Sequence, residues 1–320
     1  MILYNINFYF YIMSNENIKS RRNKLFNDGK RKECGKCHEI KSYKFFRKRQ
    51  GRLRSICEDC RNKIYAITNF KKQIKIINSL FNGRCNNCHA GLYILPALEF
   101  HHKLPSKKNY TWRDLRRKNI NEIIRLIKKE DIQVLCRNCH TLKGYTNFAK
   151  FKGIILSENI SKKNLKQIDE FILDELKNNV EYQEENNKGA QHRARIKYRI
   201  KKWIKKRLVI KKLYDGACIG CKKLKLKEGL PALEFHHRNP SKKEIKWENI
   251  SKFSTNKIIT ILKDENCVCL CKNCHSLIYS INFELYSTEI FGKEHEELTR
   301  IVKENILMLK EKINTFDFKL

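Results

Sequence analysis

The chain has 320 residues and carries 69 Lys and Arg against 34 Asp and Glu, which gives a formal net charge of +35. A field of this sign attracts a polyanion, so nucleic acid is the first expectation, DNA before RNA. A protein of the membrane surface is the rival interpretation. No apolar run reaches the ~20 residues that span a bilayer, and no membrane partner is expected.

The first 33 residues have the character of a basic, poorly ordered segment. The most apolar stretch, residues 1–13, lacks the basic flank and the small-residue cleavage site of a secretory signal peptide. Residues 14–33 are polar and basic, and Asn27, Asp28 and Gly29 form a loop signal. Without a secretory signal we expect an intracellular protein of the cytoplasm or nucleus.

Twelve of the 14 cysteines fall into six Cys-x-x-Cys pairs, a spacing that places two thiolates on one tetrahedral metal ion. In a reducing compartment this pattern favours zinc, with disulfides as the alternative. Four thiolates close the zinc tetrahedron, so the pairs predict about three structural zinc ions per chain. The ligand sets are Cys34, Cys37, Cys57 and Cys60; Cys85, Cys88, Cys136 and Cys139; and Cys218, Cys221, Cys271 and Cys274.

The first of these sets lies in a compact basic segment. Its two pairs are separated by 19 residues that include Phe45, Phe46 and a run of Lys and Arg from 41 to 54. Zinc binding would substitute for a core too small to fold alone. The pattern resembles the small zinc ribbons found ahead of phage-type nuclease domains. The resemblance implies a loop that contacts phosphates, with the two phenylalanines as local core or as base-stacking residues.

A longer cysteine unit occurs twice. Residues 96–148 align with 231–283 without a gap at an offset of 135, with 25 of 53 positions identical, and each Cys and His of the first window is retained in the second. Each copy runs through a Cys-x-x-Cys pair after a turn, a strand-like segment that ends in His-His, a basic loop, a helix and a second Cys-x-x-Cys followed directly by His. We call residues 80–148 the first repeat and 213–283 the second repeat.

Apolar residues at helical spacing predict helices over 61–82, 193–212 and 293–313, and within the acid-leaning stretch 154–190. The helix over 193–212 has eleven Lys and Arg and no acid, so it is either a solvated amphipathic helix or one that lies along a DNA backbone. Residues 184–189 interrupt the pattern and are the expected flexible joint. The last helix is expected to serve packing or self-association.

Because four thiolates complete each zinc site, the histidines are not needed as ligands of the structural zinc ions. Six occupy matched places, His101, His102 and His140 in the first repeat and His236, His237 and His275 in the second. Neighbouring strand residues point to opposite faces, so the two members of each His-His pair cannot do the same job. Together with the Pro-Ser-Lys-Lys loop and the Cys-x-Asn-Cys-His ending, this constellation resembles the HNH endonuclease family with flanking Cys-x-x-Cys pairs. That resemblance implies a ββα-metal fold with one divalent ion at the scissile phosphate.

Carried over residue by residue, the resemblance implies that His101 and His140 bind the catalytic ion, magnesium or manganese. It makes His102 the general base and Asn121 a support for the loop of the base, with Asn138 as the other candidate for the family's middle Asn. An imidazole with a pKa near ~6.5 can accept a proton from water at neutral pH, and the ion would stabilise charge at the phosphate. The corresponding residues of the second repeat are, in the same order, His236, His275, His237, Asn256 and Asn273.

Several basic residues are candidate phosphate contacts, although a solvated surface explains the loop lysines nearly as well. They are Lys107, Lys108, Lys143, Lys242 and Lys243 near the histidines and Lys201, Lys202, Lys205 and Lys206 on the basic helix. Lys143 is matched by Ile278, which favours the first repeat as the more active one. Cys267 and Cys269 are matched by Ile132 and Val134 and are therefore read as small buried hydrophobes. The matched Trp112 and Trp247 are expected to be core anchors.

The sequence thus predicts an α+β fold of small zinc-stabilised ββα-metal modules in tandem, linked by amphipathic helices. The expected parts are a basic segment 1–33, a zinc ribbon 34–62, a first module 63–150, a helical linker 151–190, a second module 191–284 and a C-terminal helix 285–320. The expected function is metal-dependent DNA endonuclease. The alternative is a multi-zinc nucleic-acid-binding regulator whose nuclease modules are inactive, or double histidines that only fill the core. The sequence does not give an oligomeric state.

Overall fold

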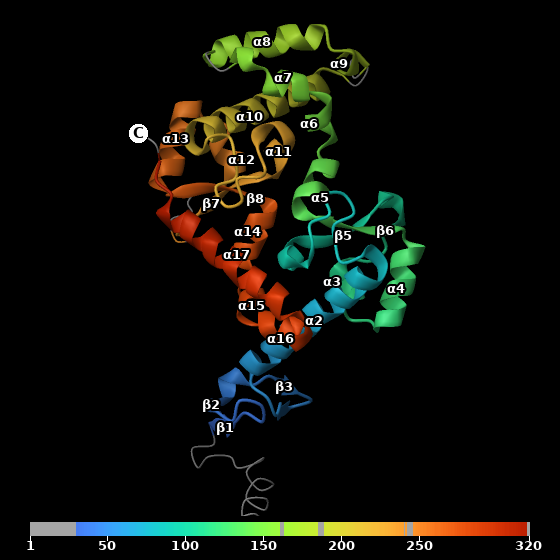
Figure 1. The fold of residues 1–320 in the computed structure, drawn as a ribbon. Coiled ribbons are helices and arrows are strands. Elements are labelled where there is room, and N and C mark those ends of the chain that lie inside the picture. Colours follow the sequence, from blue (N-terminus) through green and yellow to red (C-terminus); the bar gives the residue numbers. More distant parts are fainter. Residues whose placement is uncertain (1–29, 161–162, 185–188, 240, 242–245, 319–320) are drawn as a thin grey trace, which may run out of the picture. The chain divides into compact units, whose positions relative to one another are not determined.

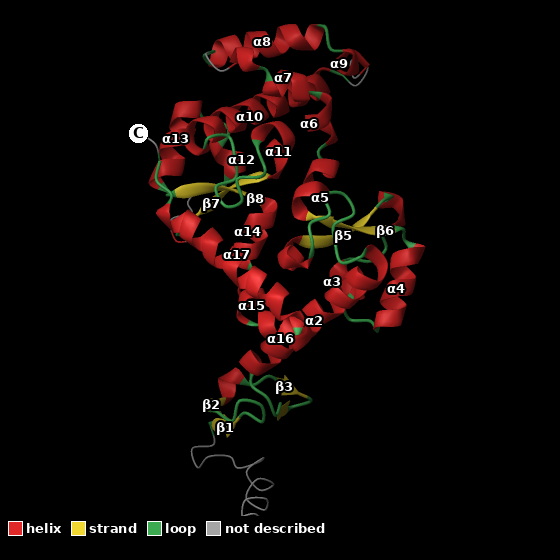
Figure 2. Cartoon of the chain, viewed as in Figure 1, coloured by secondary structure: helices red, strands yellow, loops and turns green. Residues whose placement is uncertain are grey.

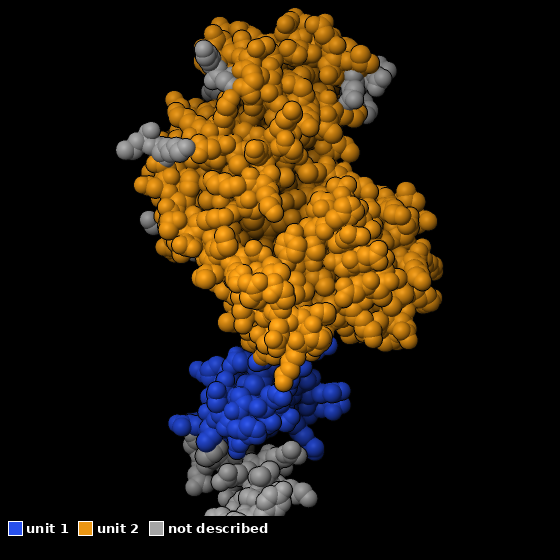
Figure 3. Space-filling model, viewed as in Figure 1, with its two compact units in different colours: residues 1–69 blue, residues 70–320 orange. Residues whose placement is uncertain are grey.

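The computed structural model describes residues 30–160, 163–184, 189–239, 241 and 246–318. The fold is α+β, with many helices and four small two-stranded antiparallel sheets among the described residues (Figure 2). The chain divides into two compact units, residues 1–69 and 70–320 (Figure 3). Most of the predicted segment 1–33 and the predicted joint at 184–189 lie outside the described residues, as do Lys242 and Lys243.

The first unit holds two short hairpins around the first cysteine set. Strands β1 (Arg31–Glu33) and β2 (Ile40–Ser42) pair, and β3 (Lys48–Arg49) pairs with β4 (Arg52–Leu53) across a turn whose Gln50 and Gly51 both have positive φ. Positive φ at both central residues is the geometry of a tight two-residue hairpin turn. A 3₁₀ helix, η1 (Tyr43–Phe45), joins the hairpins, and α2 (Glu58–Phe81) begins here. Strand β1 therefore lies within the predicted basic segment 1–33, before the first cysteine.

Phe46 is buried with Cys34 and Cys57 and forms the small core of this unit, as predicted. Phe45, by contrast, is 40% exposed, and the Lys44 ammonium lies 5.2 Å from the centre of its ring. Successive side chains point in different directions at the end of the short helix η1, so only one of the two phenylalanines can reach the cysteines. The expectation that both serve as core therefore holds for Phe46 alone.

The two repeats share one order of elements in the second unit (Figure 1). In the first repeat, η2 (Leu92–Ala97) leads into β5 (Leu98–His102), then come η3 (Pro105–Lys107), α3 (Trp112–Leu115), α4 (Ile120–Lys129), β6 (Ile132–Cys136) and α5 (Arg137–Gly144). In the second, α11 (Leu226–Gly229) and η6 (Leu230–Ala232) lead into β7 (Leu233–His237), α12 (Trp247–Ile250), α13 (Thr255–Asp264), β8 (Cys267–Cys271) and α14 (Lys272–Tyr279).

Strand register is the same in both repeats. Leu98 pairs with Cys136 and His102 with Ile132, and at an offset of 135 Leu233 pairs with Cys271 and His237 with Cys267. The helix that follows starts directly after the last strand residue, which in each repeat is a cysteine of a predicted zinc set. Each Cys-x-x-Cys-His motif therefore bends the chain from a strand into a helix and puts the final histidine on the first turns of that helix.

The duplication extends into the helices that precede the repeats, α2 and α10 (Ala190–Tyr214). Lys72 in α2 donates to the carbonyls of Arg116 (3.1 Å) and Lys118 (2.8 Å) after α3. Lys205 in α10 donates to the carbonyls of Ser251 (3.1 Å) and Phe253 (2.6 Å) after α12. Carbonyls at a helix C-terminus lack partners within the helix and attract cations, so each lysine ties its long helix to its repeat.

Helix α10 is exposed along much of its first half and mostly buried from Ile204 onwards. It packs against α8, α13, β8 and α7, and its buried residues include Lys205, Lys206 and Arg207 (Figure 1). Arg207 is 2% exposed and donates to the carbonyls of Ile155 (3.2 Å) and Ser157 (2.6 Å). Lys205 and Arg207 are buried because backbone carbonyls accept from them, which a count of Lys and Arg does not reveal.

The remaining elements are helical. Between the repeats lie α6 (Thr146–Lys150), α7 (Lys152–Leu156), η4 (Glu158–Ile160), α8 (Leu165–Lys177) and α9 (Val180–Glu184), and after the second repeat come α15 (Ile281–Leu285), α16 (Ser287–Phe291), η8 (Lys293–His295) and α17 (Glu296–Thr315). Helix α17 packs against α14, α15 and α16 and also contacts η2 of the first repeat. No helix in the described part of the chain is long and apolar enough to cross a membrane.

Candidate metal centres and histidine sites

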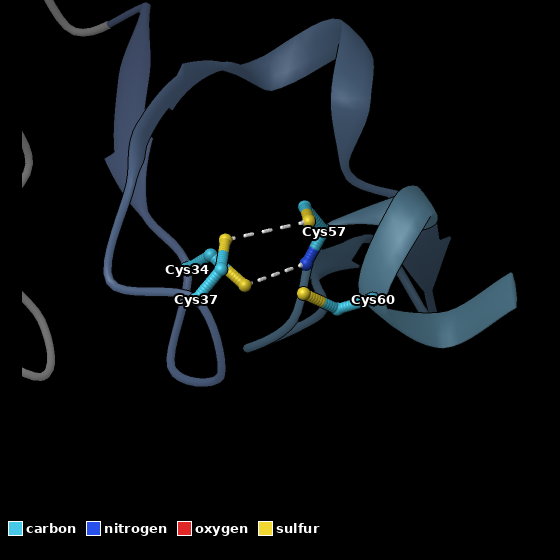
Figure 4. A group of neighbouring side chains, drawn as sticks. All are labelled: Cys34, Cys37, Cys57 and Cys60. Atoms are coloured by element: carbon cyan, nitrogen blue, oxygen red, sulfur yellow. Dashed lines mark hydrogen bonds between the residues drawn. The ribbon is translucent and has the colours of Figure 1, made fainter. Parts of the chain in front are cut away.

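The three predicted cysteine sets each converge in space. In each set the four sulfur atoms lie within 4.8 Å of one another. Figure 4 shows the first set, in which the backbone N–H of Cys57 donates to the Cys34 sulfur at 3.2 Å. The same bond recurs from Cys136 to Cys85 (3.2 Å) and from Cys271 to Cys218 (3.1 Å). Three four-cysteine groups that could hold zinc are therefore present.

The cysteines are not joined by disulfides, and at least one thiol of the first set is stabilised as the thiolate. All 14 cysteines belong to the described residues, and all are free thiols. Burial opposes ionisation of Cys34, but backbone N–H groups of Cys37, Cys57 and Lys36 outweigh it and lower the pKa of the thiol to about 6. Zinc binds thiolates, and hydrogen bonds to sulfur stabilise that form. The donor set and its surroundings fit a closed structural zinc site, with no position left for water.

His101 and His140 of the first repeat lie together on one face of β5. Their ring centroids are 4.7 Å apart, and Nδ1 of His140 is 2.5 Å from a carboxylate oxygen of Glu99. Glu99 and His101 are two residues apart on the strand and so share a face. Burial opposes ionisation of Glu99, yet the bond from His140 and the charge of Arg137 lower the pKa of the carboxyl. Burial, with the nearby His140, also lowers the pKa of His101.

The second repeat holds the same trio in His236, His275 and Glu234. The two ring centroids are 5.3 Å apart, and Nδ1 of His275 is 2.9 Å from Glu234. His236 is 7% exposed, and its Nδ1 is buried without a hydrogen-bond partner. Burial, with His275 nearby, lowers the pKa of His236 to about 4, which keeps the ring neutral and leaves a nitrogen lone pair available for a metal ion. An unpartnered buried nitrogen beside a second histidine is an observation that fits a bound ion.

His102 and His237 point to the opposite face of their strands. Nε2 of His102 lies 2.7 Å from a carboxylate oxygen of Glu130, and both side chains are buried. His237 contacts Glu265 in the same way in the second repeat. An ionised carboxylate only accepts hydrogen bonds, so Nε2 carries the proton and the lone pair is on Nδ1. The alternation of the strand therefore separates a histidine pair from a His-Glu dyad in each repeat.

Each repeat has a cavity that both kinds of histidine line. A cavity of about 570 Å³ is lined by His102 and His140 together with Lys108 and Arg137. A cavity of about 710 Å³ is lined by His237 and His275 with several basic residues, namely Arg199, Lys202, Lys206, Lys246 and Lys272. Although they lie on opposite strand faces, the histidine of the dyad and the terminal histidine therefore line one cavity in each repeat.

The two repeats contact each other through the helices that carry the terminal histidines. The backbone N–H of Asn138 donates to Oδ1 of Asn273 (3.1 Å), and the N–H of Asn273 donates to Oδ1 of Asn138 (3.2 Å). Helix α5 packs against η6 of the second repeat, and α14 packs against η2 of the first. Tyr279 of the second repeat lines the first cavity, and Tyr145, just after α5, lines the second. The asparagine and helix contacts thus each have a counterpart 135 residues away, whereas the two tyrosines are 134 residues apart.

The other predicted residues fall into three groups. Asn121 and Asn256 are exposed in the first turns of α4 and α13, and no described hydrogen bond joins either side chain to the histidines. Trp112 and Trp247 pack on Phe100 and Phe235, as expected for core anchors. Of the loop lysines, Lys107, Lys108 and Lys143 are exposed.

The lysines of α10 differ in availability. Lys205 and Lys206 are buried, and Lys201 is 2.6 Å from a carboxylate oxygen of Asp169. Lys202 is half-buried and lines the larger cavity. Of these four predicted phosphate contacts, Lys202 is the best placed to meet a ligand.

The functional residues that the prediction missed are the four glutamates, Glu99, Glu130, Glu234 and Glu265. Each matched pair is identical between the repeats, and in both repeats a glutamate lies two residues before the His-His pair. Comparison of the two copies for identical acids would have found them. Comparison with known proteins gives no matching family model, curated protein or solved structure.

Proposed function

We propose that the chain is a metal-dependent DNA endonuclease of the HNH type, with one hydrolytic site in each of two tandem ββα-metal modules. The observation that carries the proposal is the twofold occurrence of one arrangement. In it the terminal histidine, held by a glutamate and next to a second histidine, and the histidine of a separate His-Glu dyad line the same basic cavity. The net charge of +35 supports a polyanionic substrate.

The general base is His102 in the first site and His237 in the second. Nδ1 takes a proton from the attacking water as the water oxygen bonds to phosphorus and the bond from phosphorus to the leaving oxygen breaks. Glu130 or Glu265 holds the ring through Nε2–H and stabilises the imidazolium that forms, as a carboxylate does for a catalytic histidine. The proton then returns through solvent to the leaving oxygen.

The histidine pairs are proposed to hold the divalent ion. A metal-binding histidine usually donates its second ring N–H to a carboxylate, and Glu99 and Glu234 accept from His140 and His275 in this way. This leaves Nε2 of each terminal histidine for the ion. Two imidazoles suit manganese or another transition ion better than magnesium, which prefers oxygen ligands. When bound, the ion would stabilise negative charge on the scissile phosphate.

Lys108 and Arg137 line the first cavity, and Lys202 and Lys272 line the second. These basic residues are proposed to bind flanking phosphates. The reciprocal contacts of α5 and α14 support two sites in a fixed relation, so one binding event could present one strand to each. We therefore propose cleavage of both strands.

The test is a plasmid assay with manganese or magnesium on the chain that holds three zinc ions, one in each four-cysteine set. The wild type is expected to nick and then linearise the plasmid. A double variant, His140→Ala with His275→Ala, should bind without cutting, and His295→Ala, an exposed histidine outside both sites, is the control. A wild type that shifts the mobility of DNA without changing its topology would instead identify a zinc-dependent DNA-binding protein. In such a protein the buried His102 would be a core residue.

A further inference from the structure

The second repeat brings three different metal-binding side chains together next to its dyad. One candidate ligand atom each from His237, Glu265 and Cys267 lies within 4.8 Å of the others. His237 and Cys267 are directly opposite in the β7–β8 ladder, and Glu265 lies two residues before Cys267. Nε2 of His237 contacts the Glu265 carboxylate. The Cys267 side chain is fully buried beneath them.

The corresponding place in the first repeat lacks the thiol. It has the same dyad, His102 with Glu130 at 2.7 Å, but Ile132 occupies the ladder position of Cys267. Cys269 is equally buried two residues further along β8, yet it does not belong to the group. Replacement of Ile by Cys at one position therefore turns a pair into a set of three converging ligands.

We propose that His237, Glu265 and Cys267 bind a fourth transition-metal ion, of the zinc class, in the second repeat only. An imidazole nitrogen, a carboxylate oxygen and a thiolate are the three donor types that zinc uses in proteins, whereas magnesium and calcium avoid nitrogen and sulfur. The carboxylate and the thiolate together carry two negative charges and balance a divalent ion. Binding therefore leaves no net charge in this buried place.

The geometry allows an ion to enter. At zinc–ligand distances of about 2.0–2.3 Å, tetrahedral ligand atoms stand roughly 3.3 to 3.5 Å apart, so His237 and Glu265 must move slightly apart from hydrogen-bond contact to admit an ion. His237 and Glu265 both line the 710 Å³ cavity. Three protein ligands leave a fourth position for water on that side, which distinguishes this site from the closed four-cysteine sites.

Binding has a consequence that rests on the proposed function. A neutral imidazole that coordinates through Nε2 carries its proton on Nδ1, so a loaded His237 can no longer accept a proton from water. The second hydrolytic site would then be inactive, whereas the first site, which lacks the thiol, would stay active. The ion would convert an enzyme that cuts both strands into one that nicks.

Metal content of the purified full-length chain, measured without DNA after exposure to zinc and removal of free metal, tests the site. We expect four zinc ions per chain in the wild type and three in both Cys267→Ala and His237→Ala. The matched controls Cys269→Ala and His102→Ala should keep four. Circular dichroism establishes that each variant is folded.

A wild type that holds three ions overturns the proposal without any variant, and so does a folded Cys267→Ala chain with four. Neither result bears on whether the chain cuts DNA, because no substrate is present. A gain-of-site variant, Ile132→Cys, is expected to bind a fifth ion in the first repeat, and its failure to do so would contradict the claim that the thiol completes the set.

Discussion

Replacing Asn138 by Ala tests how the two repeats are held together. The N–H groups of the first turn of a helix have no partner within that helix. In α5 and α14 one such group is satisfied by the Asn of the other repeat, at 3.1 and 3.2 Å. Asn138→Ala leaves the N–H of Asn273 without its acceptor, and Asn273→Ala does the converse.

The magnitude follows from the kind of group that is left unpaired. Losing a side-chain acceptor at a helix N-terminus costs ~0.5–2 kcal/mol, and an unsatisfied buried donor costs ~1–3 kcal/mol. Both contacts are partly buried, so we expect each single variant to lose about 1 kcal/mol of unfolding free energy and the double variant about 1–2 kcal/mol.

Urea unfolding of the zinc-saturated chain, followed by circular dichroism, measures these losses. Asn121→Ala, an exposed asparagine in the first turn of α4, is the matched control and should change stability by less than ~0.5 kcal/mol. In the plasmid assay the double variant should accumulate nicked circles, because its two sites lose their fixed relation. Single variants as stable as the control would refute the reciprocal contact.

Three further predictions concern charge and metal. Burial lowers the pKa of Lys206 from 10.5 to about 8, against the opposing effect of the nearby Cys269 and Glu234. Between pH 8 and 10.5 the unfolded chain therefore binds more protons than the folded chain, so wild-type stability should rise with pH in that range. Lys206→Met should therefore stabilise the chain at pH 7 by up to about 3 kcal/mol, as measured by urea unfolding. This gain in stability should shrink towards pH 10.5, and a gain that does not change with pH would contradict the prediction. Lys202→Gln should reduce the slope of log affinity for DNA against log salt concentration by about 0.9, whereas Lys205→Gln, the buried control, should leave the slope unchanged. Equal slopes for Lys202→Gln and the wild type would refute the phosphate contact. A strong zinc chelator should expose the twelve paired thiols to a thiol reagent and abolish the helical signal, and a chain that stays folded without metal would contradict structural zinc.

Local patterns in the sequence predicted the elements that depend on spacing along the chain. The six Cys-x-x-Cys pairs gave the three cysteine clusters, and apolar periodicity gave α2, α10 and α17 to within a few residues. Alternation along the strand correctly separated His101 from His102.

What the sequence could not give depends on pairing across the fold. Glu130 meets His102 only because β5 and β6 pair in one register, and Cys267 joins His237 by the same register in the second repeat. Lys205 and Arg207 are buried because distant carbonyls accept from them, so their charge predicted a surface that they do not occupy.

The proposed hydrolytic role of the two dyads is tested most directly by plasmid cleavage with single and double base variants. With three zinc ions per chain and added manganese, the wild type should convert supercoiled plasmid to linear DNA. His102→Ala or His237→Ala alone should give mostly nicked circles, with the faster nicking from His237→Ala, which keeps His102 and Lys143 together. The double variant should bind DNA and cut nothing. A single variant that linearises plasmid at the wild-type rate, or a double variant that still cuts, would contradict the assignment of these histidines as bases.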